Sequence, residues 1–401
     1  MTGSARYTQI LRTPHVAGLL LASLVARMPI GIGALAIVLF LREERGSYAA
    51  AGLAAAAFAL GAVIGGPACG RLVDRFGQRA VLLPMAFIHA VGLGALVVLG
   101  RGAAPLGVVI ATALVAGSAI PPISAVLRPL WPELLHRTPE LVPTAYALDS
   151  VVVELVFIGG PLLTAIATAL VAPEAALLLA GALVLVGTVG FVASPPSRAW
   201  RPHPEAGSHG VLGALRSPGI RTLMAAMIPI GFCLGATEVT LPAFSEDVAS
   251  RAWAGVLLAV WSLGSAFGGL WYGARDRGSA LGIFLRMSVL VPLGTIPLAL
   301  APSLGVMLGL CLIAGVAIAP LIASANLLVA GVAPTGALTE AYTWPLTALP
   351  IAMPAISAVA GVLVEAADWR ASFAVAALVA AGSSAIAFTR RTSLTPVVAL
   401  G

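Results

Sequence analysis

Residues 66–79 read GPACGRLVDRFGQR and form a short charged stretch between two long apolar segments. Gly70 and Gly77 suit a tight turn, because glycine adopts backbone conformations that other residues avoid. Asp74 and Arg75 lie between these two glycines. Charged groups are costly in hydrocarbon, so the stretch is expected at a membrane surface. It therefore predicts a hairpin of two membrane-spanning helices.

The composition of the whole chain indicates a membrane protein. Of its 401 residues, 60% are hydrophobic and 9% are charged, and the mean hydropathy is +1.03. Soluble domains carry about 25% charged residues. The formal charge is +6, but the basic residues are all arginines and cluster in short loops, so we expect no nucleic-acid partner. The three cysteines share no metal-ligand spacing, and we expect neither a metal site nor a cofactor.

Twelve apolar segments are long enough to span a bilayer, which takes about 20 residues of helix. The pattern predicts an all-α membrane protein with twelve transmembrane helices. The predicted spans are 15–41, 48–70, 79–100, 105–127, 143–171, 174–193, 219–243, 252–273, 279–300, 303–330, 341–364 and 370–389.

The distribution of arginine predicts the orientation of the chain. An even number of spans places both termini on one side, and most loop arginines lie on that side. Basic loops are typically cytoplasmic, so we expect a multi-pass protein of the inner (cytoplasmic) membrane with both termini in the cytoplasm. Residues 194–218, rich in Pro, His and Arg, are interpreted as a cytoplasmic linker between two six-helix bundles, 1–193 and 219–401.

An internal repeat relates the two predicted bundles. Ala145-Tyr146 of span five recurs as Ala341-Tyr342 of span eleven. Parallel repeats around a site at the membrane midplane are typical of one large class of transporters. The repeat is clearest in spans two and eight, where five glycines recur at one offset: Gly52, Gly61, Gly65, Gly66 and Gly70 become Gly255, Gly264, Gly268, Gly269 and Gly273.

The charged stretch resembles the signature loop of the major facilitator superfamily. Gly70, Asp74, Arg75 and Gly77 match its pattern, and Arg79 supplies its basic end. The resemblance covers essentially the whole chain. It implies the major facilitator fold of two pseudo-symmetric six-helix bundles, and transport by alternating access. It also implies a conformational gate, because the loop aspartate of that family faces the start of span eleven in the outward-facing state.

Two further features resemble that family in part. Gly160-Pro161 in span five is similar to the bending Gly-Pro pair of its antiporters, but Thr164-Ala165 replace the Gly-Gly that follows there. Arg128 lies at the cytoplasmic end of span four, whereas the basic residue of the family lies deeper. We interpret Arg128 as a gate or topology charge.

Span eleven begins with the sequence EAYTWP. We expect Glu340 to cap this helix, where a negative charge is favoured, and to pair with Arg75 or Arg79. Aromatic residues gather at membrane interfaces, so we interpret Tyr342 and Trp344 as interface anchors.

Four charged residues inside the spans are candidates for proton coupling or substrate binding. Arg27 is about 18 Å into span one and Glu154 about 16 Å into span five, so Glu154 is our first choice as the partner of Arg27. A purely structural ion pair is the alternative. Asp149 lies about 8 Å nearer the cytoplasm and could meet Arg128 or the residues around Asp74. Glu238 is expected to face the central cavity from the second bundle.

These features predict a secondary active transporter of a small organic molecule, most simply a proton-coupled exporter of a drug or metabolite. The alternatives are a proton-linked importer or facilitator and a non-transporting receptor with the same fold. The histidines offer no convergent catalytic set, so we expect no enzymatic activity. Protons, the transported molecule and membrane lipid are the expected partners, and the protein is expected to be a monomer.

Overall fold

The computed structural model describes residues 3–102, 104–202, 212–249, 253–274, 278–345, 359–360, 362–364 and 366–395. Regular structure within these ranges is helical throughout, and eleven of the described helices are long and apolar enough to cross a membrane. They correspond to eleven of the twelve predicted spans. The remaining span, 341–364, lies mostly outside the described residues, although 338–345 are helical.

The chain forms two halves of similar construction. The first contains α1 (Gly3–Arg12), α2 (Val16–Arg45), α3 (Tyr48–Phe76), α4 (Gln78–Arg101), α5 (Leu106–Ser118), α6 (Ile123–Leu127), α7 (Leu130–Leu134), η1 (Pro139–Leu141), α8 (Val142–Leu170), α9 (Pro173–Ala193) and α10 (Pro195–Ala199). The second contains η2 (Gly213–Arg216), α11 (Pro218–Val248), α12 (Trp253–Gly273), α13 (Ala280–Thr295), η3 (Ile296–Leu300), α14 (Leu304–Gly315), α15 (Ile318–Val332), α17 (Trp369–Thr389) and η4 (Arg391–Leu394).

The repeated glycines of α3 and α12 lie where each helix crosses a neighbouring helix of its own half. A Cβ at Gly61 of α3 would lie 2.1 Å from the carbonyl oxygen of Leu114 in α5, and a Cβ at Gly264 of α12 would lie 2.1 Å from that of Leu312 in α14. Leu114 and Leu312 are themselves equivalent in the repeat. The crossing is possible only where the side chain is absent, since small residues let membrane helices approach closely. The contacts confirm that the two halves repeat one structure.

Spans four and ten are each broken, where the sequence indicated continuous helices. Span four divides into α5 and α6 around Pro121-Pro122, and span ten divides into α14 and α15 just before Pro320. Proline lacks the amide hydrogen that a helix interior requires, which accounts for the break in span four. The two breaks lie at equivalent places in the repeat, and the first of them places Arg128 directly after α6.

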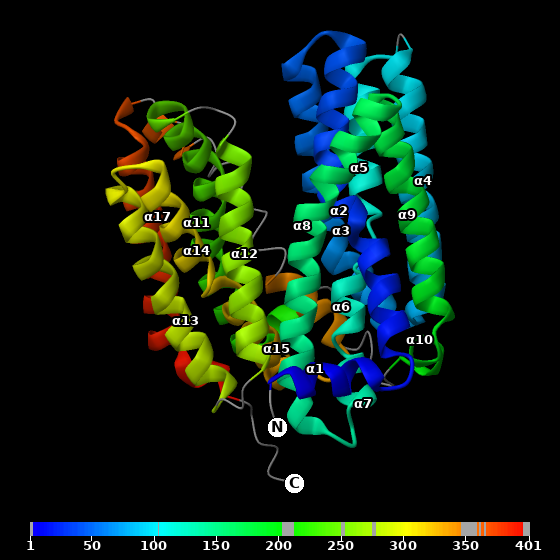
Figure 1. Cartoon of the computed structure of the whole chain (residues 1–401). Coiled ribbons are helices and arrows are strands. Elements are labelled where there is room, and N and C mark those ends of the chain that lie inside the picture. The colour runs from blue at the N-terminus through cyan, green and yellow to red at the C-terminus, as the bar shows by residue number, and fades with distance from the viewer. Residues whose placement is uncertain are drawn as a thin grey trace.

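The two halves meet near the termini and separate toward the opposite membrane face (Figure 1). One large apolar core cluster near the termini includes residues of both halves, such as Leu141 and Tyr146 with Leu321 and Tyr342. The two smaller core clusters each belong to a single half. The apolar core is therefore continuous at one end of the molecule and divided at the other.

Helices α8 and α12 form much of the junction between the halves. The hydroxyl of Thr144 donates to the carbonyl oxygen of Gly273 at 2.6 Å, and a Cβ at Gly273 would lie 2.7 Å from the Cβ of Ala147. Helix α1 adds a contact, since the Tyr7 hydroxyl donates to the carbonyl oxygen of Leu270 at 2.6 Å. Burial raises the pKa of Tyr7, so its phenol remains a hydrogen-bond donor.

Candidate functional site

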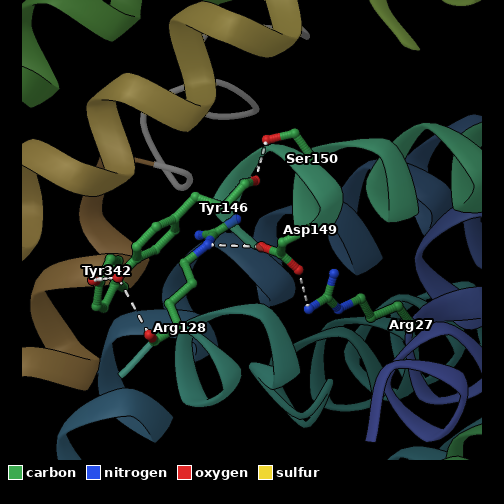
Figure 2. Close-up of polar contacts among 6 residues, drawn as sticks. All are labelled: Arg27, Arg128, Tyr146, Asp149, Ser150 and Tyr342. Carbon is green, nitrogen blue, oxygen red and sulfur yellow. Dashed lines mark hydrogen bonds and ion pairs between the residues drawn. The ribbon is translucent and has the colours of Figure 1, made fainter. Parts of the chain in front are cut away.

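Two arginines share one aspartate in the interior of the first half. Nη2 of Arg27 on α2 lies 2.7 Å from Oδ1 of Asp149 on α8. Nε of Arg128 donates to Oδ2 of the same carboxylate at 3.0 Å (Figure 2). The three side chains are between 0% and 2% exposed. We call Arg27, Arg128 and Asp149 the charge cluster.

The predicted pairing of Arg27 with Glu154 is wrong, because Arg27 pairs with Asp149. Five residues along a helix correspond to a rotation of about 140°, so Asp149 and Glu154 point to different neighbours. Asp149 faces α2, and Glu154 faces α12. The partner of Arg27 is thus determined by the face of α8 that meets α2 more than by depth in the membrane. The long side chain of Arg27 spans the difference in depth between its own backbone and Asp149. The suggested contact between Asp149 and Arg128 is present.

Arg128 is not a charge at the membrane surface, as the sequence suggested, because its side chain is fully buried. Its guanidinium carbon lies 5.9 Å from the centre of the Tyr342 ring, which belongs to the other half. Such a contact with an aromatic face is attractive. The break in span four gives Arg128 this inward position, so the topology interpretation is corrected.

Two tyrosines at equivalent positions of the repeat meet across the junction. The hydroxyl oxygens of Tyr146 and Tyr342 lie 2.5 Å apart, and the Tyr146 hydroxyl is 3.3 Å from the carbonyl oxygen of Arg128 (Figure 2). Both rings are buried, at 0% and 1% exposure. Tyr342 is therefore not an interface anchor. The recurring Ala-Tyr pair in the sequence is the signal that could have identified this contact, and we call these residues the tyrosine pair.

Asp74 joins the charged stretch to the second half. Its two carboxylate oxygens accept hydrogen bonds from the amides of Thr339, at 3.1 Å, and Glu340, at 2.9 Å. These amides lie in the first turn of the helix that begins at residue 338, where unpaired N–H groups and the helix dipole favour an anion. The structure thus brings Asp74 to the start of span eleven. Its role as a gate stays a prediction.

Gly70, Gly77 and Arg75, which lie close to Asp74 in the chain, make different structural contributions. Gly77 has a φ of 91°, a conformation that other residues rarely adopt. A Cβ at Gly70 would lie 3.1 Å from the Cα of Glu340, so this glycine allows the close approach of the second half. Arg75 stacks over the ring of Phe76, with 5.1 Å from its guanidinium carbon to the ring centre.

Glu340 is held by different partners from those we expected. Its Oε1 accepts from the amide of Ala214, at 3.3 Å, and from Nε1 of Trp344, at 3.2 Å. No ion pair among the described residues joins Glu340 to Arg75 or Arg79, so that predicted pairing is wrong. The side chain is 3% exposed and fastens η2, at the end of the inter-bundle linker, to span eleven.

Glu154 also reaches across the junction. Its Oε1 accepts a hydrogen bond of 2.6 Å from the hydroxyl of Ser265 on α12. In the part of the chain that the structure describes, no arginine forms an ion pair with Glu154. Glu238, on α11 of the second half, is exposed. Neither acid belongs to the charge cluster.

Gly160, beside Pro161 in α8, forms the crossing between α8 and α2. A Cβ at Gly160 would lie 2.6 Å from the Cα of Gly31. Pro161 lies inside α8, which continues without a break. The pair thus permits close packing within the first half. Among the described residues, no group of three or more potential metal ligands occurs.

Comparisons with known proteins agree with this architecture. The sequence profile of the Major Facilitator Superfamily matches residues 19–344. The chain is similar in structure to a bacterial homologue of the iron transporter ferroportin in its outward-facing state, with a TM-score of 0.72, 14% identity, and 94% of this chain and 99% of that chain covered. No curated protein matches the sequence.

Two other solved structures are also similar. The Escherichia coli fucose:proton symporter FucP has a TM-score of 0.68 and 16% identity, with 94% of this chain and 99% of that chain covered. The human organic anion transporter MFSD10 has a TM-score of 0.67 and 19% identity, with 92% and 97% covered. At these identities the likeness shows the fold.

Proposed function

Since the chain belongs to the major facilitator superfamily, we propose that this membrane transporter is a secondary active exporter of a small organic molecule, driven by protons. It works as a monomer in the cytoplasmic membrane. Its halves, 1–193 and 219–401, are joined by a cytoplasmic linker, 194–218. The concentration of arginines on the side of the termini supports this orientation.

In this orientation the structure is outward-facing. The halves are joined near the termini and diverge at the other face. Alternating access then requires the junction to open toward the cytoplasm while the opposite ends approach each other. Asp74 and the tyrosine pair both hold the junction closed, so they are the gate contacts that must break and reform in each cycle.

The contact between Glu154 and Ser265 is the observation that carries the proposal of proton coupling. A carboxylic acid near the membrane midplane has its only hydrogen-bond partner among the described residues on the opposite half. Rocking of the halves separates the two side chains and changes the solvation of Glu154, which controls proton binding by a buried carboxyl group. Glu154 would take up a proton from the outside and release it to the cytoplasm.

Glu154 is a better proton carrier than Asp149. Asp149 lies between two guanidiniums, and adjacent cations favour the ionised form of a carboxylate. Glu154 has no such neighbours among the described residues. Glu238 is exposed on the second half, and we place it in the substrate path rather than in the proton path. A fucose:proton symporter among the similar structures supports proton coupling in this fold.

The test uses proteoliposomes loaded with a pH-sensitive dye, an imposed pH gradient and a panel of amphiphilic organic molecules. We expect proton flux only with transported molecules, and expect Glu154→Gln to abolish gradient-driven transport while substrate exchange continues. Glu140→Gln, an exposed acid outside the site, is the matched control. Normal gradient-driven transport by Glu154→Gln would show that another group carries the proton. Movement of the organic molecule in the same direction as the protons would show that the protein is an importer.

A further inference from the structure

The charge cluster is not electrically balanced. Arg27 and Arg128 carry two positive charges and Asp149 carries one negative charge, which leaves a net charge of about +1 in a fully buried site. No other acid forms an ion pair with either arginine in the described part of the chain. An uncompensated buried charge costs several kcal/mol. The site is therefore poised to accept one further negative charge.

The guanidiniums also have unused hydrogen-bond donors. Nε and Nη1 of Arg27, and Nη1 and Nη2 of Arg128, are buried and have no acceptor within the described protein. Buried donors without partners are rare and costly. The planar arrangement of guanidinium donors matches a carboxylate, which can accept two parallel hydrogen bonds. The missing negative charge and the missing hydrogen-bond acceptors thus both indicate a carboxylate.

The surfaces beyond the charge cluster are apolar. On α2, Ile30 lies one turn farther from the termini than Arg27 and is 41% exposed. On α8, Phe157 lies three turns beyond Tyr146 on the same helix face and is 55% exposed. Tyr146 contacts the opposite half, so this face of α8 turns toward the space between the halves.

We infer that Arg27 and Arg128 bind the carboxylate of an amphiphilic monoanion, whose apolar body lies along the faces of α2 and α8 that carry Ile30 and Phe157. One carboxylate supplies the missing charge and accepts from the unused guanidinium nitrogens. The inference rests on the proposed transport function and names its substrate class. Asp149 then acts as a positioning residue that holds both guanidiniums in place.

Access to this site depends on the tyrosine pair. The Tyr342 ring covers Arg128 from the second half, so opening the junction uncovers the guanidinium on the side of the termini. When the junction closes, the Tyr342 ring returns to the guanidinium of Arg128. The attraction between ring and guanidinium then replaces part of the attraction between the guanidinium and the bound carboxylate. The monoanion therefore binds the cytoplasm-open state, as an exporter requires.

Thermal unfolding of the purified full-length protein in detergent tests this inference without a gradient. The probe is 4-phenylbutyrate, and the neutral 4-phenylbutyramide and sodium chloride of equal ionic strength are the reference compounds. We expect the carboxylate to raise Tm with concentration, and expect the amide and chloride to have no such effect. Arg27→Gln should weaken the apparent affinity by about tenfold or more, because it removes charged donors. Arg286→Gln, in the second half, should leave it unchanged.

Two further measurements, on Arg27→Gln and on the new variant Tyr342→Phe, separate binding from a structural role. Arg27→Gln leaves a neutral Arg128–Asp149 pair, so its unliganded Tm should not fall. Tyr342→Phe should tighten binding, because a larger cytoplasm-open population lowers the apparent Kd. Equal shifts with the amide or chloride, or an unchanged carboxylate shift in Arg27→Gln, would overturn the inference. Failure of the wild-type protein to bind the carboxylate, together with intact proton-driven transport of another molecule, would reject the anion site alone.

Discussion

The hydroxyl oxygens of Tyr146 and Tyr342 lie 2.5 Å apart across the junction of the two halves, at equivalent positions of the internal repeat. Each tyrosine thus faces its own counterpart on a pseudo-twofold axis. A contact on this axis is broken by any motion that separates the halves at this end. The tyrosine pair is therefore a direct reporter of the conformational state.

Removal of either hydroxyl should favour the cytoplasm-open state. In Tyr146→Phe, Tyr342 loses its buried partner, and the junction should weaken by about 1 kcal/mol, or about fivefold in population. The measurement is maleimide labelling of Ser150→Cys, at a site that is 3% exposed, in a background without the native cysteines. The double variant with Tyr342→Phe should be less than additive. Fully additive effects would mean that the two hydroxyls do not interact.

Neutralisation of Asp74 should slow transport. Asp74→Asn keeps an acceptor for one amide but loses the charge at the helix N-terminus, which is worth about 0.3–2 kcal/mol. We expect turnover to fall by up to about thirtyfold while KM changes little, because the proposed substrate site is elsewhere. Glu140→Gln is again the control in the proteoliposome assay. Wild-type turnover in Asp74→Asn would remove this residue from the gate.

Loss of Asp149 should be far more damaging than loss of one arginine. Asp149→Asn leaves two guanidiniums buried without a counter-ion, and removing one member of a buried ion pair costs about 3–5 kcal/mol. Thermal unfolding in detergent should show a large fall in Tm. Asp247→Asn is the comparison, since that carboxylate accepts from Nε1 of Trp369 in a partly buried position. Similar stability of the two variants would contradict the electrostatic account of the charge cluster.

The helix crossings predict opposite effects for two glycines of α12. A Cβ at Gly268 would lie 1.9 Å from the carbonyl oxygen of Val316, whereas a Cβ at Gly255 meets nothing within 4 Å. Gly268→Ala should separate α12 from α14 and lower Tm clearly. Gly255→Ala should be neutral or stabilising by about 0.5–1 kcal/mol, because alanine favours the helix. Equal Tm values for both variants would show that the crossing can relax.

Much of the fold could be predicted because the bilayer fixes helix length and the repeat leaves glycines at backbone contacts. Gly61 and Gly264 recur because each faces a carbonyl oxygen of the neighbouring helix. The contact of Asp74 with the start of span eleven was expected from the resemblance of its loop to a family signature. These features depend on segment length or on a short motif, which a sequence shows directly.

The charge cluster was less accessible to sequence reasoning. The partner of Arg27 depends on which face of α8 meets α2, and that face is set by packing rather than depth. The burial of Arg128 depends on the break near Pro121-Pro122, which the hydropathy of the segment does not indicate. The tyrosine pair was visible as a repeated Ala-Tyr, but a repeat alone does not show that the two copies touch.

The paired glycine crossings have a mechanical consequence. Helices α3 and α5, and likewise α12 and α14, are in contact backbone to backbone, so neither pair can slide without a steric clash. These crossings stiffen part of each half against internal sliding, so we expect each half to tilt as a unit about the junction. Tilting about the junction near the termini would then change the distance between the halves at the far membrane face, where the apolar core is divided. On the proposed mechanism, the contacts of Asp74 and of the tyrosine pair would therefore control an opening on the other side of the membrane.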